Sequence, residues 1–279
     1  MRPLRLEALR VDRVTVAIRD LPSSLSGIKL VQWSDLHYDG ERLPDALLEE
    51  AIAVTDRENP DLFLLTGDLI TDDPSPIFQL VSIIKAIKSQ AGIFACLGNH
   101  DNYYPGARGT VTKALTEAGI RVLWNEVATP FGEGFPLVGL ADYWSREFAP
   151  AIVLEKLDPA IPRLVLSHNP DTAMILQFWR VDLQLSGHTH GGQIALPGIG
   201  PVARVIQDIR DSFPENVRAW LPFARQCDGV VKYWQWARGL HRVGENQLYV
   251  NRGLGTYFPG RLFCPPEVTV ITLIREGSP

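Results

Sequence analysis

The 279-residue sequence predicts an α/β domain with a largely central sheet. Short apolar or alternating runs typical of strands recur along the chain, and segments with helical spacing of apolar residues separate them. Strands that alternate with helices in this way are typical of α/β domains. No repeat, low-complexity run or linker divides the chain. We therefore expect a single domain over residues 1–279, with an insertion of different character at about 201–242.

The N-terminal half starts with two runs typical of strands, over residues 14–18 and 28–33, which we expect to pair as a hairpin. Pro44 favours a helix start, and apolar residues at helical spacing follow it. The apolar run 62–65 is typical of a strand buried on both faces. The pattern then predicts two helices and two strands, with helices over 78–88 and 110–118 and strands over 93–97 and 121–124.

The C-terminal half continues the alternation of strands and helices. Two further helices are expected, over 150–157 and 171–178. Five further runs predict strands, over 137–141, 164–166, 183–185, 248–251 and 268–274.

Polar side chains directly follow five of these expected strands. Five of the six histidines in the chain lie at these strand ends. In open α/β sheets, sites form outside the carboxyl ends of the strands, so we expect these side chains to converge. In chain order, the residues that follow the five strands are Asp35 and His37, Asp68, Asn99 and His100, His168, and His188 and His190.

The residue types and their spacing predict a metal site. Residues two apart in an extended chain point to the same side, so Asp35 with His37, and His188 with His190, could each reach one ion. Carboxylate, amide and imidazole ligands suit manganese, iron, zinc or cobalt. Taken singly, the runs at 35–37, 67–68 and 98–101 are more often ordinary turns, whereas the run at 187–192 is harder to explain as a turn. Five of them in order, each after a strand, favour a shared site.

These motifs resemble the signature of the calcineurin-like metallophosphoesterase superfamily over about residues 28–192. The runs at 187–193, 251–255 and 264–267 are similar to its bacterial YkuE/YaeI-type branch. Some enzymes that resemble this branch cleave the pyrophosphate of UDP-2,3-diacylglucosamine. The resemblance implies a four-layer αββα sandwich, with a dinuclear metal site at the C-terminal ends of the strands.

The resemblance also implies a role for each site residue and two divalent ions as cofactors, with manganese first and iron, zinc or cobalt as alternatives. His100 would not bind metal but would protonate the leaving group, while a hydroxide that bridges the two ions attacks phosphorus. By motif, the ligands of one ion would be Asp35, His37 and His190, those of the other Asn99, His168 and His188, and Asp68 would bridge both.

The sequence departs from the protein serine/threonine phosphatase branch of this superfamily. The carboxylate that orients the catalytic histidine in that branch corresponds to Thr71 here, and either Asp72 or Asp101 could replace it. This departure counts against a phosphoprotein substrate.

We therefore expect hydrolysis of a phosphodiester or pyrophosphate bond in a small, lipid- or nucleotide-linked substrate such as UDP-2,3-diacylglucosamine. Alternatives are a phosphomonoesterase, a cyclic-nucleotide phosphodiesterase and a non-catalytic scaffold on the same fold. The net charge of −5 argues against a long nucleic-acid substrate.

The segment at about 201–242 is rich in aromatic and basic residues. It holds three of the seven tryptophans (Trp220, Trp234 and Trp236) and seven Lys or Arg against four Asp or Glu. This composition suits contact with a membrane surface, and the alternative is an insertion that packs its aromatics on the sandwich.

The expected cellular location rests on features that the sequence lacks. It shows no signal-peptide pattern and no membrane-spanning run, and its three cysteines are far apart. We expect a cytoplasmic protein, peripheral at the inner face of the membrane.

Overall fold

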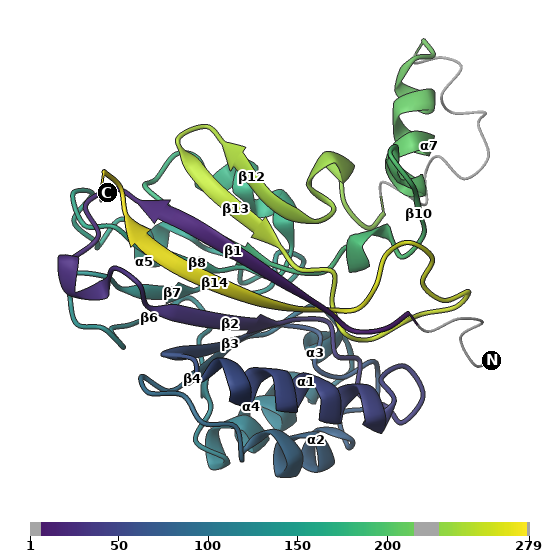
Figure 1. Cartoon of the computed structure of the whole chain (residues 1–279), viewed down its shortest axis with the longest axis horizontal. Helices are drawn as coiled ribbons and strands as arrows, with labels where there is room; N and C mark the ends of the chain where they lie inside the picture. The colour runs from purple at the N-terminus through teal and green to yellow at the C-terminus, as the bar shows by residue number, and fades with distance from the viewer. Residues whose placement is uncertain (1–6, 215–228, 278–279) are drawn as a thin grey trace.

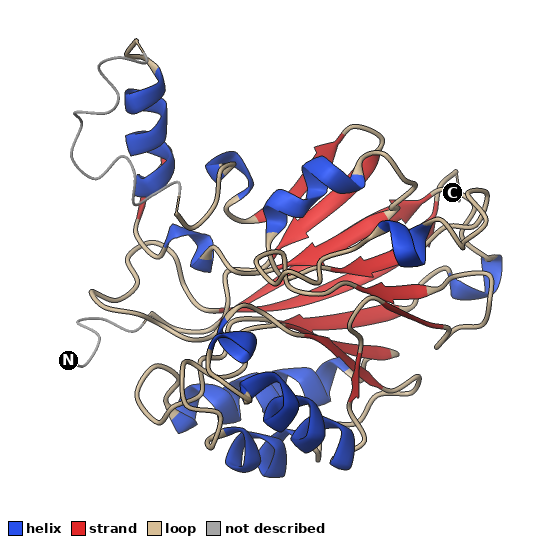
Figure 2. Ribbon diagram, turned by 180° about the vertical axis from the view of Figure 1, so that it is seen from behind, coloured by secondary structure: helices blue, strands red, loops and turns tan. Residues whose placement is uncertain are grey.

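Two six-stranded sheets lie face to face, and helices cover their outer faces (Figures 1 and 2). The computed structural model describes residues 7–214 and 229–277. One apolar cluster joins side chains of both sheets, such as Leu64 and Leu185. Further clusters lie between each sheet and its helices, for example around Leu48 and around Val165. These four layers confirm the αββα sandwich.

The first sheet has the strand order β1-β14-β2-β3-β4-β5. Strands β2, β3, β4 and β5 run parallel, whereas β14 is antiparallel to β2. Its strands in chain order are β1 (Arg10–Ile18), β2 (Lys29–Trp33), β3 (Leu62–Thr66), β4 (Ile93–Cys96), β5 (Arg121–Val122) and β14 (Glu267–Arg275).

The second sheet has the strand order β12-β13-β9-β8-β7-β6. Strands β7, β8, β9 and β13 run parallel, and the outer strands β6 and β12 are antiparallel to their neighbours. Its strands are β6 (Glu126–Ala128), β7 (Leu137–Gly139), β8 (Leu164–Leu166), β9 (Leu183–Ser186), β12 (Gly239–Val243) and β13 (Asn246–Val250). A separate two-stranded sheet pairs β10 (Ala195–Leu196) with β11 (Gly200–Pro201).

Helices α1, α2 and α4 lie together on one side of the strands, as Figure 1 shows. The α1 helix buries Leu47, Leu48, Ala51 and Val54, which recur at helical spacing, and burial of each leucine stabilises the fold by about 1.5–3 kcal/mol. The α-helices are α1 (Asp45–Glu58), α2 (Ile77–Ile84), α3 (His100–Tyr103), α4 (Ala107–Glu117), α5 (Ala151–Leu154), α6 (Ala173–Leu176) and α7 (Val202–Asp211). Short 3-10 helices span Ser23–Leu25, Pro170–Thr172, His190–Gly192 and Trp234–Trp236.

The predicted hairpin between the first two strands is wrong. Strand β14, from the end of the chain, lies between β1 and β2 and pairs with both. A 3-10 helix at Ser23–Leu25 carries the chain from β1 to β2 instead of a tight hairpin turn. The alternation alone indicated a largely central sheet, whereas the structure has two stacked sheets, as the resemblance implied. The apolar pattern of a buried strand does not show which sheet the strand joins.

The insertion at about 201–242 begins with α7, which projects from the end of the sandwich (Figure 1). Trp234 and Trp236 are buried against apolar neighbours, Trp236 together with Val250. Membrane contact through these two side chains is therefore wrong, and the packing alternative holds for them. Trp220 lies outside the described residues. Among the residues that are described, no helix combines the length and apolar character that crossing a membrane requires.

Candidate metal centre

The polar residues singled out in the sequence lie at one edge of the sandwich, where parallel strands of both sheets end. In the first sheet, β2 runs into Asp35 and His37, and β3 runs into Asp68. In the second sheet, β8 and β9 run into His168 and His188. The carboxyl ends of parallel strands meet at the same edge of a sheet, so the fold itself brings these side chains together.

Seven of the eight expected site residues form three overlapping clusters in which the potential ligand atoms lie within 4.8 Å of one another. The eighth, Asn99, precedes His100 in the chain and is buried. The clusters are Asp35 with His37 and His190, then His37 with Asp68 and His100, and then Asp68 with His168 and His188.

Asp68 belongs to two of the clusters and contacts His37, which also belongs to the third. Its Oδ2 atom is 3.1 Å from His168 Nε2 and 3.6 Å from His37 Nε2. Its Oδ1 atom accepts a hydrogen bond of 2.9 Å from the backbone N–H of His100. One carboxylate thus contacts imidazoles from both sheets.

His188 and His190 fall into different clusters, contrary to the argument that residues two apart would reach one ion. The backbone at these residues is not extended: φ is 71° at His188 and 50° at His190. Asp35, His37 and Asp68 also have positive φ. Such strain in non-glycine residues is concentrated at functional sites.

Gly98 makes room for the Asp68 carboxylate. A Cβ atom at residue 98 would lie 2.1 Å from Asp68 Oδ1, so any larger residue would displace the carboxylate. This glycine, two residues after β4, is therefore needed for close approach to the site.

Burial keeps most of the imidazoles neutral. Burial lowers the pKa of His37 to about 3, and burial together with His168 lowers that of His188 to about 3. At His168 burial is outweighed by the Asp68 carboxylate, which raises the pKa to about 10. Neutral imidazoles are the form that binds metal ions.

The donor set fits metal ions. His37 Nε2 lies 3.1 Å from His190 Nε2, and His188 Nδ1 lies 3.2 Å from His168 Nε2, so ring nitrogens face one another in two pairs. Within the described part of the chain, the buried Asn99 Oδ1 atom has no hydrogen-bond partner. Buried polar groups are rarely left unpaired, so this oxygen and these nitrogens match the ligand atoms of two cation sites.

Outer contacts orient the same imidazoles. Backbone carbonyls lie 2.7 Å from His168 Nδ1 (Thr66) and 3.0 Å from His188 Nε2 (Val230). Metal-binding histidines commonly donate their other ring N–H to such an acceptor, which fixes the ring and its tautomer.

His100 is oriented by a backbone carbonyl rather than by a carboxylate. Its Nδ1 lies 2.6 Å from the carbonyl oxygen of Thr71. Asp101, one of the two expected replacements, instead accepts hydrogen bonds from the backbone N–H groups of Leu69, Ile70 and Gly98. Neither Asp72 nor Asp101 therefore takes the orienting role, and Asp101 shapes the loop that carries Asp68.

Sequence reasoning missed three contributors to the site. Trp144 packs its ring on His188, with centroids 4.7 Å apart. The Thr71 carbonyl is a backbone group, so no side-chain pattern marks it. Tyr257, from the segment before β14, lies 3.0 Å from His37 Nδ1. A lone aromatic residue in a loop carries no spacing signal that points to a strand end 220 positions earlier.

Comparisons with known proteins agree with this geometry. A family model described as calcineurin-like phosphoesterase matches residues 28–192. The phosphodiesterase YaeI of Escherichia coli is 34% identical, over 88% of this chain and 82% of its own. The metallophosphoesterase YkuE of Bacillus subtilis is 32% identical, over 91% and 81%. The UDP-2,3-diacylglucosamine pyrophosphatase LpxG of Chlamydia muridarum is 27% identical, over 96% and 90%.

The family match covers more than half of the chain and includes every strand end that carries the candidate site. Its relatives YaeI and YkuE extend the similarity to most of the sequence. The chain therefore belongs to the calcineurin-like phosphoesterase family and is a metallophosphoesterase, a hydrolase of the branch that includes YaeI, YkuE and LpxG.

Proposed function

We propose that the protein hydrolyses a phosphodiester or pyrophosphate bond with two divalent cations bound at the candidate metal centre. The observation that carries this proposal is that the Asp68 carboxylate contacts both His168 and His37, which belong to the two proposed sets of metal ligands. Two-metal sites are common in enzymes that hydrolyse phosphate esters, and a carboxylate in contact with both sets of ligands would bind both ions.

Each ion would have its own set of ligands. Manganese is the first candidate, and iron, zinc and cobalt accept the same imidazole and carboxylate ligands. When bound, two such ions supply Lewis acidity to the phosphoryl group and make water a stronger nucleophile near neutral pH. The proposed ligands are Asp35, His37 and His190 for one ion, Asn99, His168 and His188 for the other, and Asp68 for both.

The charges of the ligands favour an anionic substrate. Asp35 and Asp68 offset only half of the charge of two divalent ions, and the other ligands are neutral. With both ions bound, the site would be positive although the chain has a net charge of −5. A phosphate group is attracted to it, and its non-bridging oxygens are stabilised as charge develops.

His100 is proposed to donate a proton to the leaving oxygen. Its ring lies beside Asp68 and His37 in the central cluster. The Thr71 carbonyl can only accept a hydrogen bond, so Nδ1 carries a proton and Nε2 is the atom that exchanges one with the substrate. The backbone N–H of His100 bonds to Asp68, which fixes the distance between the acid and the metal centre.

A lipid-linked or nucleotide-linked substrate is supported by the similarity to LpxG, whose name specifies UDP-2,3-diacylglucosamine. Hydrolysis of a phosphomonoester or a cyclic nucleotide is the alternative, since both would use the same ligands. The scaffold alternative is not favoured, because all eight expected residues are present and seven of them converge.

Assays of metal-free protein reloaded with manganese, iron, zinc or cobalt test the proposal. We expect bis(p-nitrophenyl) phosphate to be hydrolysed faster than p-nitrophenyl phosphate, chelation to abolish turnover, and manganese to restore it. Preference for the monoester would favour the phosphomonoesterase alternative. No turnover with any of the four metals would contradict the enzymatic proposal.

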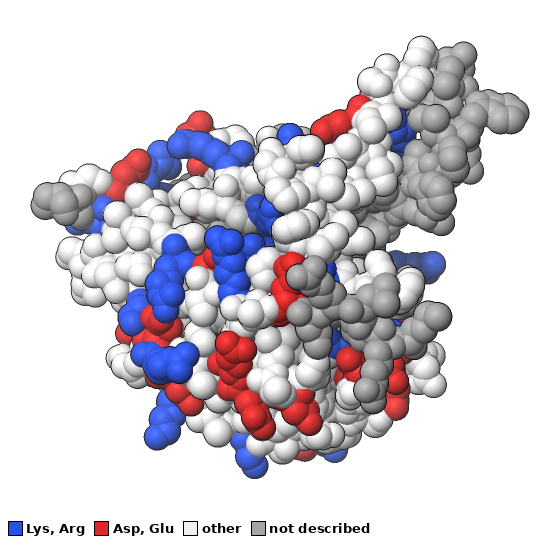
Figure 3. Space-filling view, turned by 45° about the vertical axis from the view of Figure 1, so that its right-hand side comes forward, with Lys and Arg blue, Asp and Glu red and all other residues white. Residues whose placement is uncertain are grey.

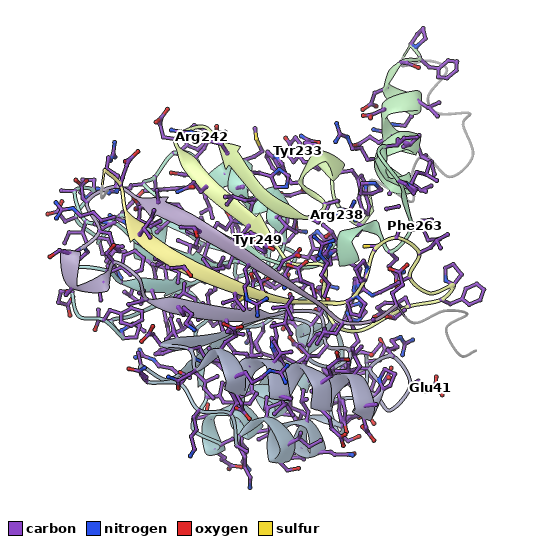
Figure 4. All side chains as sticks on the ribbon, in the orientation of Figure 1. Glu41, Tyr233, Arg238, Arg242, Tyr249 and Phe263 are labelled. Atoms are coloured by element: carbon purple, nitrogen blue, oxygen red, sulfur yellow. The ribbon has the colours of Figure 1, made fainter. Side chains whose placement is uncertain are left out.

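We further propose that the end of the molecule near α7 contacts a lipid surface. Leu196, Ile199, Ile209 and Phe263 are large apolar side chains exposed there, and the basic side chain of Arg204 pairs with Asp208 within α7. Figure 3 shows mostly uncharged atoms over the described part of this projection, and Figure 4 places Phe263 at the same end of the molecule. Exposed apolar groups beside basic ones suit a membrane surface.

Flotation with vesicles of anionic phospholipid tests this contact. The wild-type protein is expected to float, whereas the Ile199→Asp/Ile209→Asp variant stays in the dense fraction. Phe178→Asp is the control, because Phe178 is also a large exposed apolar residue but follows α6 elsewhere in the fold. Absence of flotation for the wild type would contradict the proposed membrane contact.

A further inference from the structure

Tyr257 contacts proposed metal ligands as well as the proposed acid, although it lies outside residues 28–192, which match the family model. Its hydroxyl oxygen is 3.0 Å from His37 Nδ1 and 3.5 Å from His100 Nε2. Its ring also packs edge-on against His190, with centroids 5.3 Å apart. One phenol thus touches two proposed metal ligands and the proposed acid.

The loop around Tyr257 is held firmly in place. The backbone N–H of Tyr257 donates a 2.7 Å hydrogen bond to Gln193 Oε1, and the Arg42 guanidinium lies 4.7 Å from the centre of its ring. The buried Arg261 donates hydrogen bonds to the carbonyl oxygens of Gly255 and His190, at 2.6 and 3.3 Å. These contacts fix the position of the phenol relative to the histidines.

The directions of the hydrogen bonds follow from the partners. His37 Nε2 faces His190 and Asp68, so this nitrogen is the one directed at the metal centre. A neutral imidazole that binds an ion through Nε2 carries its proton on Nδ1 and donates it to the Tyr257 oxygen. The phenol proton of Tyr257 is then free to form a hydrogen bond on the side of the hydroxyl away from His37.

His100 lies on that side of the Tyr257 hydroxyl. Its Nδ1–H donates to the Thr71 carbonyl, which leaves Nε2 as the ring nitrogen that faces the Tyr257 oxygen. The separation of 3.5 Å between Nε2 and the Tyr257 oxygen is at the outer limit of a direct hydrogen bond. The Tyr257 hydroxyl and His100 Nε2 therefore lie side by side next to the metal centre.

From this geometry we propose that Tyr257 is a positioning residue for the reaction. Its oxygen accepts from His37 and fixes the ring of that ligand, and its O–H group is directed to the leaving-group side beside His100. The inference rests on the proposed function and adds a residue from the C-terminal segment to it.

Tyr257→Phe, which removes only the hydroxyl, tests the proposal. The variant is expected to bind manganese about 10–100-fold more weakly than the wild type, measured by electron paramagnetic resonance with manganese as the only ligand. Losses of this size are typical when a metal-binding side chain loses its hydrogen-bond partner. At saturating manganese, kcat for bis(p-nitrophenyl) phosphate is expected to fall up to about tenfold with KM unchanged, the effect of one hydrogen bond. Tyr104→Phe, which removes an exposed hydroxyl after α3, is the matched control.

Each half of the proposal has its own contradicting result. If Tyr257→Phe binds manganese as tightly as the wild type, Tyr257 does not orient His37 for metal binding. An unchanged kcat at saturating manganese would overturn its role on the leaving-group side. A wild-type protein that binds no manganese would overturn the proposed metal centre itself, which separates failure of the proposed function from failure of this inference.

Discussion

Asp68→Asn is expected to lose metal and activity together. The amide keeps the shape of the side chain but removes the negative charge that contacts both proposed sets of metal ligands. Loss of two-metal stabilisation of the phosphoryl group is worth several kcal/mol, so kcat/KM should fall at least about 10³-fold. Metal content per chain, measured by mass spectrometry after loading with manganese and desalting, should fall in parallel.

Asp72→Asn is the matched control for the loss of charge. Asp72 lies four residues further along the same loop, and its side chain is exposed. This variant should keep both the metal content and the activity of the wild type. Full metal occupancy in Asp68→Asn would show that the carboxylate does not bridge the ions. Circular dichroism of both metal-free variants establishes that they fold alike.

His100→Asn is expected to keep its metal and lose turnover. The ring lies in the central cluster, but its Nδ1 is bonded to the Thr71 carbonyl and its proposed role is proton donation. Loss of a general acid costs about 10²–10⁴-fold in rate. The loss should be larger for diphenyl phosphate than for bis(p-nitrophenyl) phosphate, because phenolate is the more basic leaving group and needs the proton more.

His241→Asn is the control for removal of a histidine. His241 lies in β12 and bonds through Nε2 to the carbonyl of Arg238, away from the clusters. The His241→Asn substitution should leave both metal content and turnover unchanged. Equal metal loss in His100→Asn and Asp68→Asn, or equal rate losses on the two diesters, would contradict the assignment of His100 as the acid.

Local patterns in the sequence predicted most strands but not their pairing. The runs at 62–65 and 164–166 became β3 and β8 within about one residue, since continuous apolar runs are typical of buried strands. The position of β14 between β1 and β2 is a contact between the two ends of the chain, and nothing in their local sequence encodes it. Strand β12 alternates only weakly and was not expected.

The candidate site was more predictable than the topology. Side chains such as Asp35 and His168 directly follow apolar strands, and the carboxyl ends of parallel strands meet whichever strands are neighbours. The separation of His188 from His190 depends on left-handed backbone conformations that spacing does not show. The partner of His100 is a carbonyl, and Tyr257 reaches the site through the fold of the C-terminal segment.

The proposed site holds two cations that share the Asp68 carboxylate. Crystals grown with manganese and measured at the manganese absorption edge provide the strongest test. Two anomalous peaks are expected, one among Asp35, His37 and His190 and the other among Asn99, His168 and His188, with Asp68 between them. A single peak, or none at this edge of the sandwich, would contradict the two-cation site.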